Sequence, residues 1–242
     1  MAGELEELRA ACDVERLGAV PAEAPAARVS AEGMPATRRG APDGMRTVFL
    51  AGGIASGKST VAKLLRERGA WLCDLDQVSR EVLEPGSELL GEIAAEFGSD
   101  LIDPFTGELN RRLLAERAFA SAEATERLED IEMPAIKARL AQILTNTCCA
   151  AAAPTVAVVE VPLLDRVEDL LPLADEVLVV VAPLALRRER AQGRGMDAVD
   201  FDARVEHQPS DDYLRSHATY VIDNAGDARA LEAAVDAWWG ER

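Results

Sequence analysis

The stretch that decides the fold reads V-F-L-A-G-G-I-A-S-G-K-S-T and runs from Val48 to Thr60. It begins as an apolar strand pattern and then fits the spacing G-x-x-x-x-G-K-S, and residues 61–65 continue at helical spacing. Glycines let the backbone N–H groups of such a loop surround phosphate oxygens, and the following helix adds partial positive charge at its N-terminus. A chance glycine-rich turn would rarely fill every fixed position between a strand and a helix. The stretch therefore predicts a site for a nucleoside triphosphate.

Two side chains of this loop have predicted chemical roles. Lys58 supplies a full positive charge to the β- and γ-phosphates, and the hydroxyl of Ser59 lies where a phosphate-bound Mg²⁺ needs an oxygen ligand. The sequence thus predicts ATP as co-substrate together with Mg²⁺. The residues expected to bind ATP are Gly53, Ile54, Ala55, Ser56, Gly57, Lys58, Ser59 and Thr60 of the loop, and Asn224 near a later strand end.

The composition of the chain excludes several classes of function. Its 242 residues include 43 Asp and Glu against 26 Lys and Arg, a formal net charge of −17, so neither nucleic acid nor an anionic membrane is an expected partner. The four cysteines lack C-x-x-C spacing, which favours a reducing cytoplasm over disulfide or zinc frameworks. His207 and His217, the only histidines, are expected at the surface rather than in a metal site or a triad. No run of about 18 apolar residues predicts a membrane span.

Residues 1–44 are rich in Ala, Glu, Arg, Pro and Gly, and we expect a disordered extension there, with Met45 as a candidate true start. From residue 45 to residue 242, apolar runs alternate with helical patterns, which after a phosphate loop predicts an α/β fold with a doubly wound parallel sheet. Phe201, Trp238 and Trp239 are assigned to packing. The expected strands are 46–51, 70–74, 155–160, 176–181 and 220–222; the expected helices are 58–68, 77–83, 87–97, 110–147 with a break near Pro134, 184–194, 201–207 and 228–239.

An acidic segment, C-D-L-D-Q-V-S-R, closes the second expected strand and ends at Arg80. A kinase needs a carboxylate near the acceptor hydroxyl, and Asp76 is placed to take its proton. Arg80 lies one helical turn farther on, where it could hold an anionic substrate. The alternative is a helix N-cap at Asp74 or Asp76 beside a solvent-facing arginine, and the position next in sequence to a phosphate loop favours the catalytic interpretation.

The segment after the fourth expected strand contains a cluster of four arginines: Arg187, Arg188, Arg190 and Arg194. In small-molecule kinases, arginines of a mobile lid neutralise charge on the transferring phosphoryl group. The alternative is an ordinary solvated helix face, which so acidic a chain makes less attractive. Glu160, at the end of another buried strand, is a candidate for holding the Mg²⁺ shell through water.

Further motifs follow in order along the chain: R-E-V-L-E-P-G-S, F-G-x-x-L-I-D, G-E-L-N-R-R-L-L, P-L-L, R-x-x-x-R, R-V-x-x-Q and Y-V-I-D-N. Together with G-G-I-x-S-G-K-S and D-x-D-x-x-x-R, they make residues 46–239 resemble the dephospho-CoA kinase family. The resemblance implies a P-loop kinase of the nucleoside-monophosphate-kinase type. It also implies transfer of the ATP γ-phosphoryl group to the ribose 3′-hydroxyl of dephospho-CoA, the last step of coenzyme A synthesis.

The resemblance further implies a nucleotide core with two additions, a helical substrate-binding insertion at about 77–148 and a lid at about 184–217. It places the phosphate loop on residues 52–60. The remaining site residues would be Asp76 as base, Arg190 and Arg194 in the lid, and Arg80 and Arg111 on the substrate.

The chain departs from the family pattern at several positions. At residue 55 a methyl group near the phosphates would weaken nucleotide binding if the backbone there needs a positive φ. None of the departures removes Lys58, Asp76 or Arg80. They are Ala51 for Thr and Ala55 for Gly, Met133 for the His before Pro134, Lys137 for Arg, and Leu214 and Thr219 for Lys and Asp, with Arg215 as a candidate source of the lost charge.

Two rival functions stay open at this stage. One is a related kinase that phosphorylates another nucleoside, nucleotide or small alcohol. The other is a nucleotide-dependent switch or a regulatory pseudokinase, which the substitutions at Ala55 and Met133 suggest. The absence of an N-K-x-D guanine motif argues against a GTPase.

Overall fold

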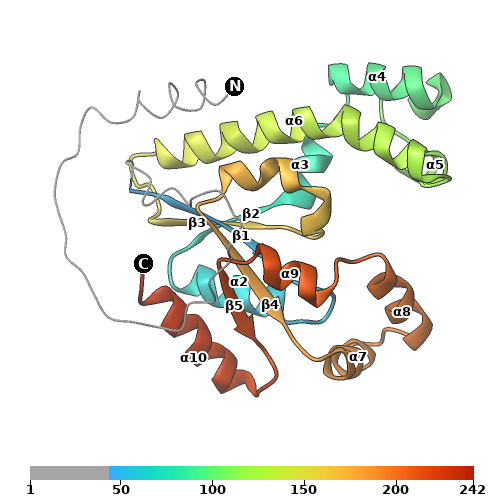
Figure 1. Ribbon diagram of the computed structural model, residues 1–242. Coiled ribbons are helices and arrows are strands. Elements are labelled where there is room, and N and C mark those ends of the chain that lie inside the picture. Colours follow the sequence, from blue (N-terminus) through green and yellow to red (C-terminus); the bar gives the residue numbers. More distant parts are fainter. Residues whose placement is uncertain (1–43) are drawn as a thin grey trace. The chain divides into compact units, whose positions relative to one another are not determined.

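The computed structural model describes residues 44–242 (Figure 1). The extension predicted for residues 1–44 lies, apart from Gly44, outside the described residues. Among the helices of the described part, none is long and apolar enough to cross a membrane. The described chain forms two compact units, one of residues up to Cys73 together with Leu144–Arg242, and one of Asp74–Ile143.

The first unit is built on a five-stranded sheet with the order β2-β3-β1-β4-β5. Strand β1 pairs in parallel with β3 and β4, so that Phe49 lies opposite Val159 on one side and Val177 on the other. Strand β5 continues the parallel arrangement beside β4. This confirms the predicted doubly wound α/β class and puts the end of β1 in the middle of the sheet. The strands are β1 (Arg46–Ala51), β2 (Trp71–Asp74), β3 (Val156–Glu160), β4 (Glu176–Val181) and β5 (Tyr220–Asp223).

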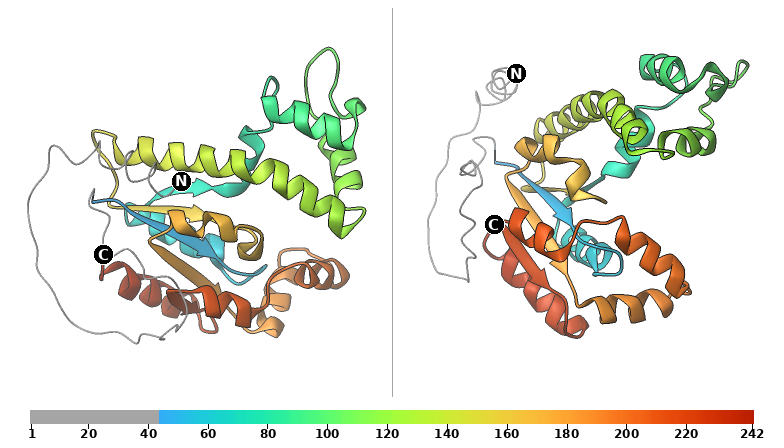
Figure 2. Two further views of the ribbon diagram at one scale, coloured as in Figure 1. Left: turned by 45° about the horizontal axis from the view of Figure 1, so that its top comes forward. Right: turned by 45° about the vertical axis from the view of Figure 1, so that its right-hand side comes forward.

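Helices α2 and α10 contact each other beside the sheet (Figure 2), and their apolar faces form one core with the strands. Leu65 of α2 and Trp238 of α10 are both fully buried in this core. Phe201 is also fully buried, which confirms its assignment to packing. The helices of this unit are α2 (Lys58–Glu67), α7 (Leu184–Gln192), α8 (Ala198–Glu206), α9 (Asp211–His217) and α10 (Ala228–Trp239), with 3-10 turns η2 (Leu164–Arg166) and η3 (Glu168–Leu173).

The second unit is helical, and its own apolar core joins Ile93, Leu101 and Ala118. Side-chain caps begin several of its helices, with Asp74, Ser87 and Asn110 each accepting a hydrogen bond from a backbone N–H of the first turn. These caps explain why the helices start where they do. The elements are α3 (Leu75–Glu81), α4 (Glu88–Phe97), η1 (Ser99–Leu101), α5 (Arg111–Ala118) and α6 (Ala122–Cys148), of which the last residues belong to the first unit.

The predicted break near Pro134 is wrong, because α6 runs through this residue without interruption. A proline inside a helix removes one hydrogen bond and crowds the preceding turn, at a cost of about 3 kcal/mol. Here the residues on both sides of Pro134 are anchored, since Leu128 is buried and Ile131 and Ala135 pack against the same core. Their burial offsets the local cost, and the proline side chain itself is exposed.

We expect Trp238→Ala to destabilise the protein by about 3–5 kcal/mol, because it removes the largest fully buried side chain and leaves a cavity. The measurement is urea unfolding followed by circular dichroism. Trp239→Ala is the matched control, since Trp239 is only partly buried against the same core and should cost clearly less. Equal losses in the two variants would contradict the assignment of Trp238 to the core.

Candidate nucleotide-binding site

The loop between β1 and α2 folds as the sequence predicts, with left-handed backbone at two positions. Gly57, which caps α2, has φ 107°. Ala55 has φ 59° and is the one non-glycine residue with positive φ in the described part of the chain. The family's glycine at this position therefore has a physical reason, because a side chain disfavours left-handed backbone.

Asn224, directly after β5, supports the loop from behind. Its side chain is buried, and Nδ2 donates to the backbone oxygen of Ser56 at 2.7 Å. A Cβ atom added to Gly57 would lie 2.2 Å from the same Nδ2. Asn224 thus contacts the loop backbone rather than lining the space in front of it. The Ser56 side chain is also buried, and its Oγ has no hydrogen-bond partner in the structure.

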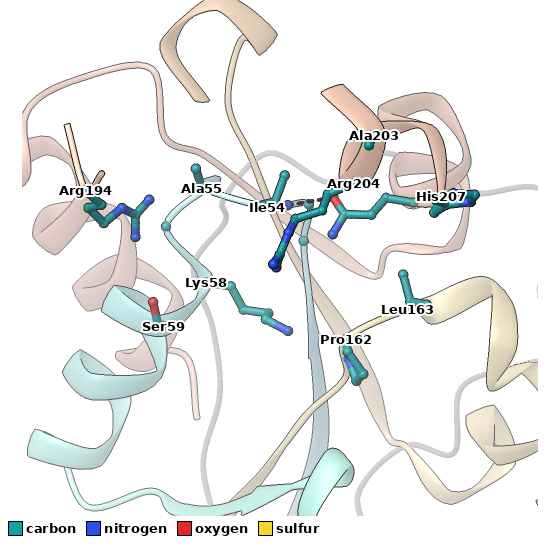
Figure 3. A pocket seen from close by; sticks show the side chains of 14 residues that line it. Ile54, Ala55, Lys58, Ser59, Pro162, Leu163, Arg194, Ala203, Arg204 and His207 are labelled. Carbon is teal, nitrogen blue, oxygen red and sulfur yellow. Dashed lines mark hydrogen bonds between the residues drawn. The ribbon is translucent and has the colours of Figure 1, made fainter. Parts of the chain in front are cut away.

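The space in front of the loop is a cavity of about 440 Å³, a volume within the range of small-molecule sites. Lys58 points into it from the start of α2, and Arg204 and His207 approach it from the end of α8 (Figure 3). The Lys58 ammonium also donates to the backbone oxygen of Val161 at 2.9 Å. The lining residues are Gly52, Gly53, Ile54, Ala55, Gly57, Lys58, Ser59, Pro162, Leu163, Arg194, Ala203, Arg204, His207 and Gln208.

The two predicted lid arginines lie in different surroundings. Arg194 is exposed and lines the cavity, while its Nε donates to the Arg190 backbone oxygen at 3.1 Å. Arg190 does not line the cavity, and its Nη2 donates to the backbone oxygen of Asn224 at 3.1 Å. Arg190 therefore connects α7 with the residue that supports the loop.

Two predicted residues flank the loop and the sheet without lining the cavity. Thr60 is exposed in the first turn of α2, one residue beyond Ser59. Glu160 is half-buried at the end of β3, next to the chain segment whose Pro162 and Leu163 line the cavity.

Arg187 belongs to the arginine cluster recognised in the sequence but was not among the predicted site residues. Its side chain is 5% exposed, and Nε donates to the backbone oxygen of Ile54 at 2.9 Å. Burial lowers the pKa of the Arg187 guanidinium, and the neighbouring Asp211 carboxylate opposes this effect. The signal available in the sequence was the spacing 187, 190 and 194, which would put all three arginines on one face of the expected helix 184–194. The observed helix α7 ends at Gln192, so Arg194 lies just beyond it.

Two further departures from the family pattern, Leu214 and Thr219, have structural explanations, and the structure also places Arg215, the candidate source of the lost charge. Leu214 is buried on α9. The Thr219 hydroxyl accepts a hydrogen bond from the Val177 backbone N–H at 2.9 Å and so ties the start of β5 to β4. Arg215 pairs with the exposed Asp223 at 3.2 Å.

The second unit holds the predicted acceptor-side residues. Asp74 is the N-cap of α3, because its Oδ1 accepts from the Asp76 N–H at 3.0 Å. Asp76 is exposed in the first turn of α3, and Arg80 is exposed one turn later on the same face. The structure brings Arg111 to this helix, since its Nη2 donates to the Arg80 backbone oxygen at 3.2 Å.

Glu132 of α6 lies near Arg111 and is unusual among the carboxylates. Burial raises the pKa of the Glu132 carboxyl to about 7; the charge of Arg111 opposes this shift and that of Glu129 adds to it. Because a carboxyl in water has a pKa near 4.5, folding becomes linked to uptake of a proton at Glu132 between these values.

We expect Glu132→Gln to change the pH dependence of stability. The folded protein holds the Glu132 proton up to about pH 7, whereas the unfolded chain releases it near pH 4.5, so the wild type loses stability as the pH rises through this window. The variant should match the wild type near pH 4.5 and exceed it by about 1–3 kcal/mol at pH 8. Urea unfolding across the pH range measures the difference. The exposed Glu126 of the same helix gives the control, Glu126→Gln, and a flat difference for Glu132→Gln would refute the buried carboxyl.

Comparison with known proteins supports the nucleotide-site reading. The family model described as dephospho-CoA kinase matches residues 46–230. A dephospho-CoA kinase of Corynebacterium diphtheriae is 40% identical over 196 residues, 81% of this chain and 96% of that protein. One of Anaeromyxobacter dehalogenans is 42% identical over 193 residues, 79% and 90% of the two chains.

Solved structures show the same fold. A crystal structure from Thermus thermophilus has a TM-score of 0.66 at 30% identity and covers 81% of this chain and 97% of that one. The structure of a dephospho-CoA kinase from Campylobacter jejuni has a TM-score of 0.60 at 23% identity, with 81% and 96% coverage.

Proposed function

Because this chain belongs to the dephospho-CoA kinase family, we propose that it transfers the γ-phosphoryl group of ATP to the ribose 3′-hydroxyl of dephospho-CoA. The observation that carries the proposal is the loop of residues 52–59, which lies at the end of the central strand and lines a cavity that Lys58 enters. A cytoplasmic location belongs to the proposal, in keeping with the cysteine spacing and with the supply of ATP there.

In the proposed complex, the backbone N–H groups of the loop and the Lys58 ammonium bind the β- and γ-phosphates. The exposed Ser59 hydroxyl fits an oxygen ligand of Mg²⁺, and Glu160 is proposed to hold the ion's water shell. Bound there with the nucleotide, Mg²⁺ would supply charge neutralisation. Oxygen donors of this kind suit Mg²⁺, which is usually held by one or two protein ligands and the phosphates.

The acceptor side of the reaction is assigned to the second unit. We propose that Asp76 accepts the proton of the 3′-hydroxyl. The hydroxyl oxygen then forms a bond to the γ-phosphorus, while the bond between that phosphorus and the bridging oxygen of ADP breaks. Asp74 is less suited to this role because its carboxylate caps α3. Arg80 and Arg111 would hold the anionic substrate. They lie together because the Arg111 side chain donates a hydrogen bond to the Arg80 backbone oxygen.

The lid contributes positive charge to the transferring group in this proposal. Arg194 lines the cavity and would act directly on the phosphates, and Arg190 would act beside it from α7. Charges preorganised in this way stabilise the transition state more than the bound substrates.

The left-handed backbone of Ala55 is the reason to test one alternative function, that of a protein that binds ATP without catalysis. A coupled assay for ADP release with and without dephospho-CoA separates the possibilities. The proposal expects ADP release that depends on dephospho-CoA. A non-catalytic switch would bind ATP without acceptor-dependent turnover, and a related kinase would release ADP with another acceptor from a panel of nucleosides, nucleotides and small alcohols.

Lys58→Ala should lower kcat by about 10³-fold or more in a folded protein, because it removes a charge that matters most in the transition state. Steady-state kinetics with circular dichroism as the folding check measure this. Lys63→Ala is the matched control, since Lys63 lies on the same helix, is exposed and pairs with Glu67. Near-normal kcat in folded Lys58→Ala would falsify the loop assignment.

Asp76→Asn should lower kcat by roughly 10²–10⁴-fold and leave the ATP affinity little changed, as for a positioned general base. Asp74→Asn should do much less, because asparagine keeps the helix cap that Asp74 provides. Measuring kcat and the Kd for ATP in both variants compares the two carboxylates directly. If Asp74→Asn proves the more damaging, the base is not Asp76.

A further inference from the structure

Both backbone groups of one loop residue, Ile54, are held by side chains of the predicted lid. The Ile54 N–H donates to Gln208 Oε1 at 2.7 Å, and the Ile54 oxygen accepts from Arg187 Nε at 2.9 Å. The guanidinium of Arg187 also donates to Gln208 Oε1 at 3.4 Å and to Asp211 Oδ1 at 3.1 Å. Helix α7 and the segment after α8 thus meet at one residue of the loop, and Asp211 at the start of α9 reaches it only through Arg187.

The environment of Arg187 shows that this contact is part of the fold. Its side chain is buried, and a Cβ atom added to Gly53 would lie 2.2 Å from Arg187 Nη2. A buried charge is unfavourable unless it is paired and hydrogen-bonded. Arg187 meets this condition through the Asp211 carboxylate, the Ile54 oxygen and the Gln208 amide.

The residue that follows Ile54 is the left-handed Ala55. A non-glycine residue with positive φ is strained, and such strain persists where the surrounding structure over-determines the backbone. Two sets of bonds determine it here: the contacts of Arg187 and Gln208 with Ile54, and the Ser56 N–H, which donates to the Gly53 oxygen at 3.1 Å. The held residue, Ile54, therefore lies directly before the strained Ala55.

We propose that Arg187 and Gln208 are positioning residues that hold the Ile54–Ala55 backbone in its left-handed turn and so keep the loop ready for nucleotide. They act through Ile54 and not on the transferring group. In this chain they compensate for alanine at a position where glycine would adopt the turn without strain. The inference rests on the proposed role of residues 52–59 as the nucleotide-binding loop.

The test is a double-mutant cycle between Gln208 and Ala55, with the Kd for Mg-ATP measured by isothermal titration calorimetry on the full chain. Gln208→Ala should raise this Kd about tenfold, because the alanine-containing loop can then relax out of the left-handed turn. In an Ala55→Gly background the same change should raise the Kd about twofold or less, since glycine adopts the turn without the strain. Ala55→Gly should thus rescue Gln208→Ala.

Two further variants separate positioning from general folding. Arg187→Lys keeps a buried positive charge but loses the planar fork, and it should show the same rescue by Ala55→Gly. Gln192→Ala, an exposed glutamine at the end of α7, is the matched control and should leave the Kd unchanged. The melting temperature of every variant is followed by circular dichroism, because a purely structural role would lower it without any rescue in nucleotide affinity.

Equal increases in Kd in the alanine and glycine backgrounds would overturn the proposal, as would an unchanged Kd in Gln208→Ala. Either outcome leaves the proposed reaction intact as long as Lys58→Ala abolishes turnover. Normal turnover in folded Lys58→Ala instead removes the assignment of residues 52–59 as the nucleotide-binding loop, and the inference about the loop falls with it, whereas ADP release that does not depend on dephospho-CoA would remove the proposed function.

Discussion

The structure depends on one constraint, a backbone turn after the central strand that is left-handed at residues 55 and 57. Glycine at residue 57 adopts this conformation without strain, whereas alanine at residue 55 is strained and needs help from the surrounding structure. The surrounding elements supply that help from different directions. Asn224 after β5 holds the Ser56 oxygen, and Arg187 and Gln208 hold Ile54. The parallel sheet matters for function because it brings these distant segments to the end of β1.

The arginines of the lid make different contacts and have different roles, which the composition alone does not reveal. The arginine cluster of residues 187–194 was a candidate for neutralising phosphate charge, and the spacing 187, 190 and 194 would share one face of the expected helix. In the structure only Arg194 of these lines the cavity, Arg190 bonds to the backbone of Asn224, and Arg187 is buried against the loop. Arginines in this acidic chain thus position the backbone as well as neutralise the charge of a ligand. The first role is filled by a buried side chain and the second by an exposed one.

Much of the fold was predictable because its signals are local. The phosphate-loop motif, the continuous apolar runs of β1 and β4 and the pattern of α10 each lie within a few turns of chain. The errors and omissions arose where distant residues decide the outcome. Packing on both sides of Pro134 overrides the helix break, and Arg187 and Gln208 reach Ile54 across 133 and 154 positions of sequence. Choosing Asp74 as the cap of α3 likewise needed its extended backbone, φ −97° and ψ 115°, which the D-x-D pattern does not specify.

The contact between Asn224 and the loop has an evolutionary consequence. The amide occupies the volume that any side chain at position 57 would need, so the two residues constrain each other although 167 positions separate them along the chain. A change at one position alters which changes are tolerated at the other. Selection on nucleotide binding therefore acts on the pair, and residue 57 is the more constrained of the two, because its φ of 107° would disfavour a side chain even if residue 224 became smaller.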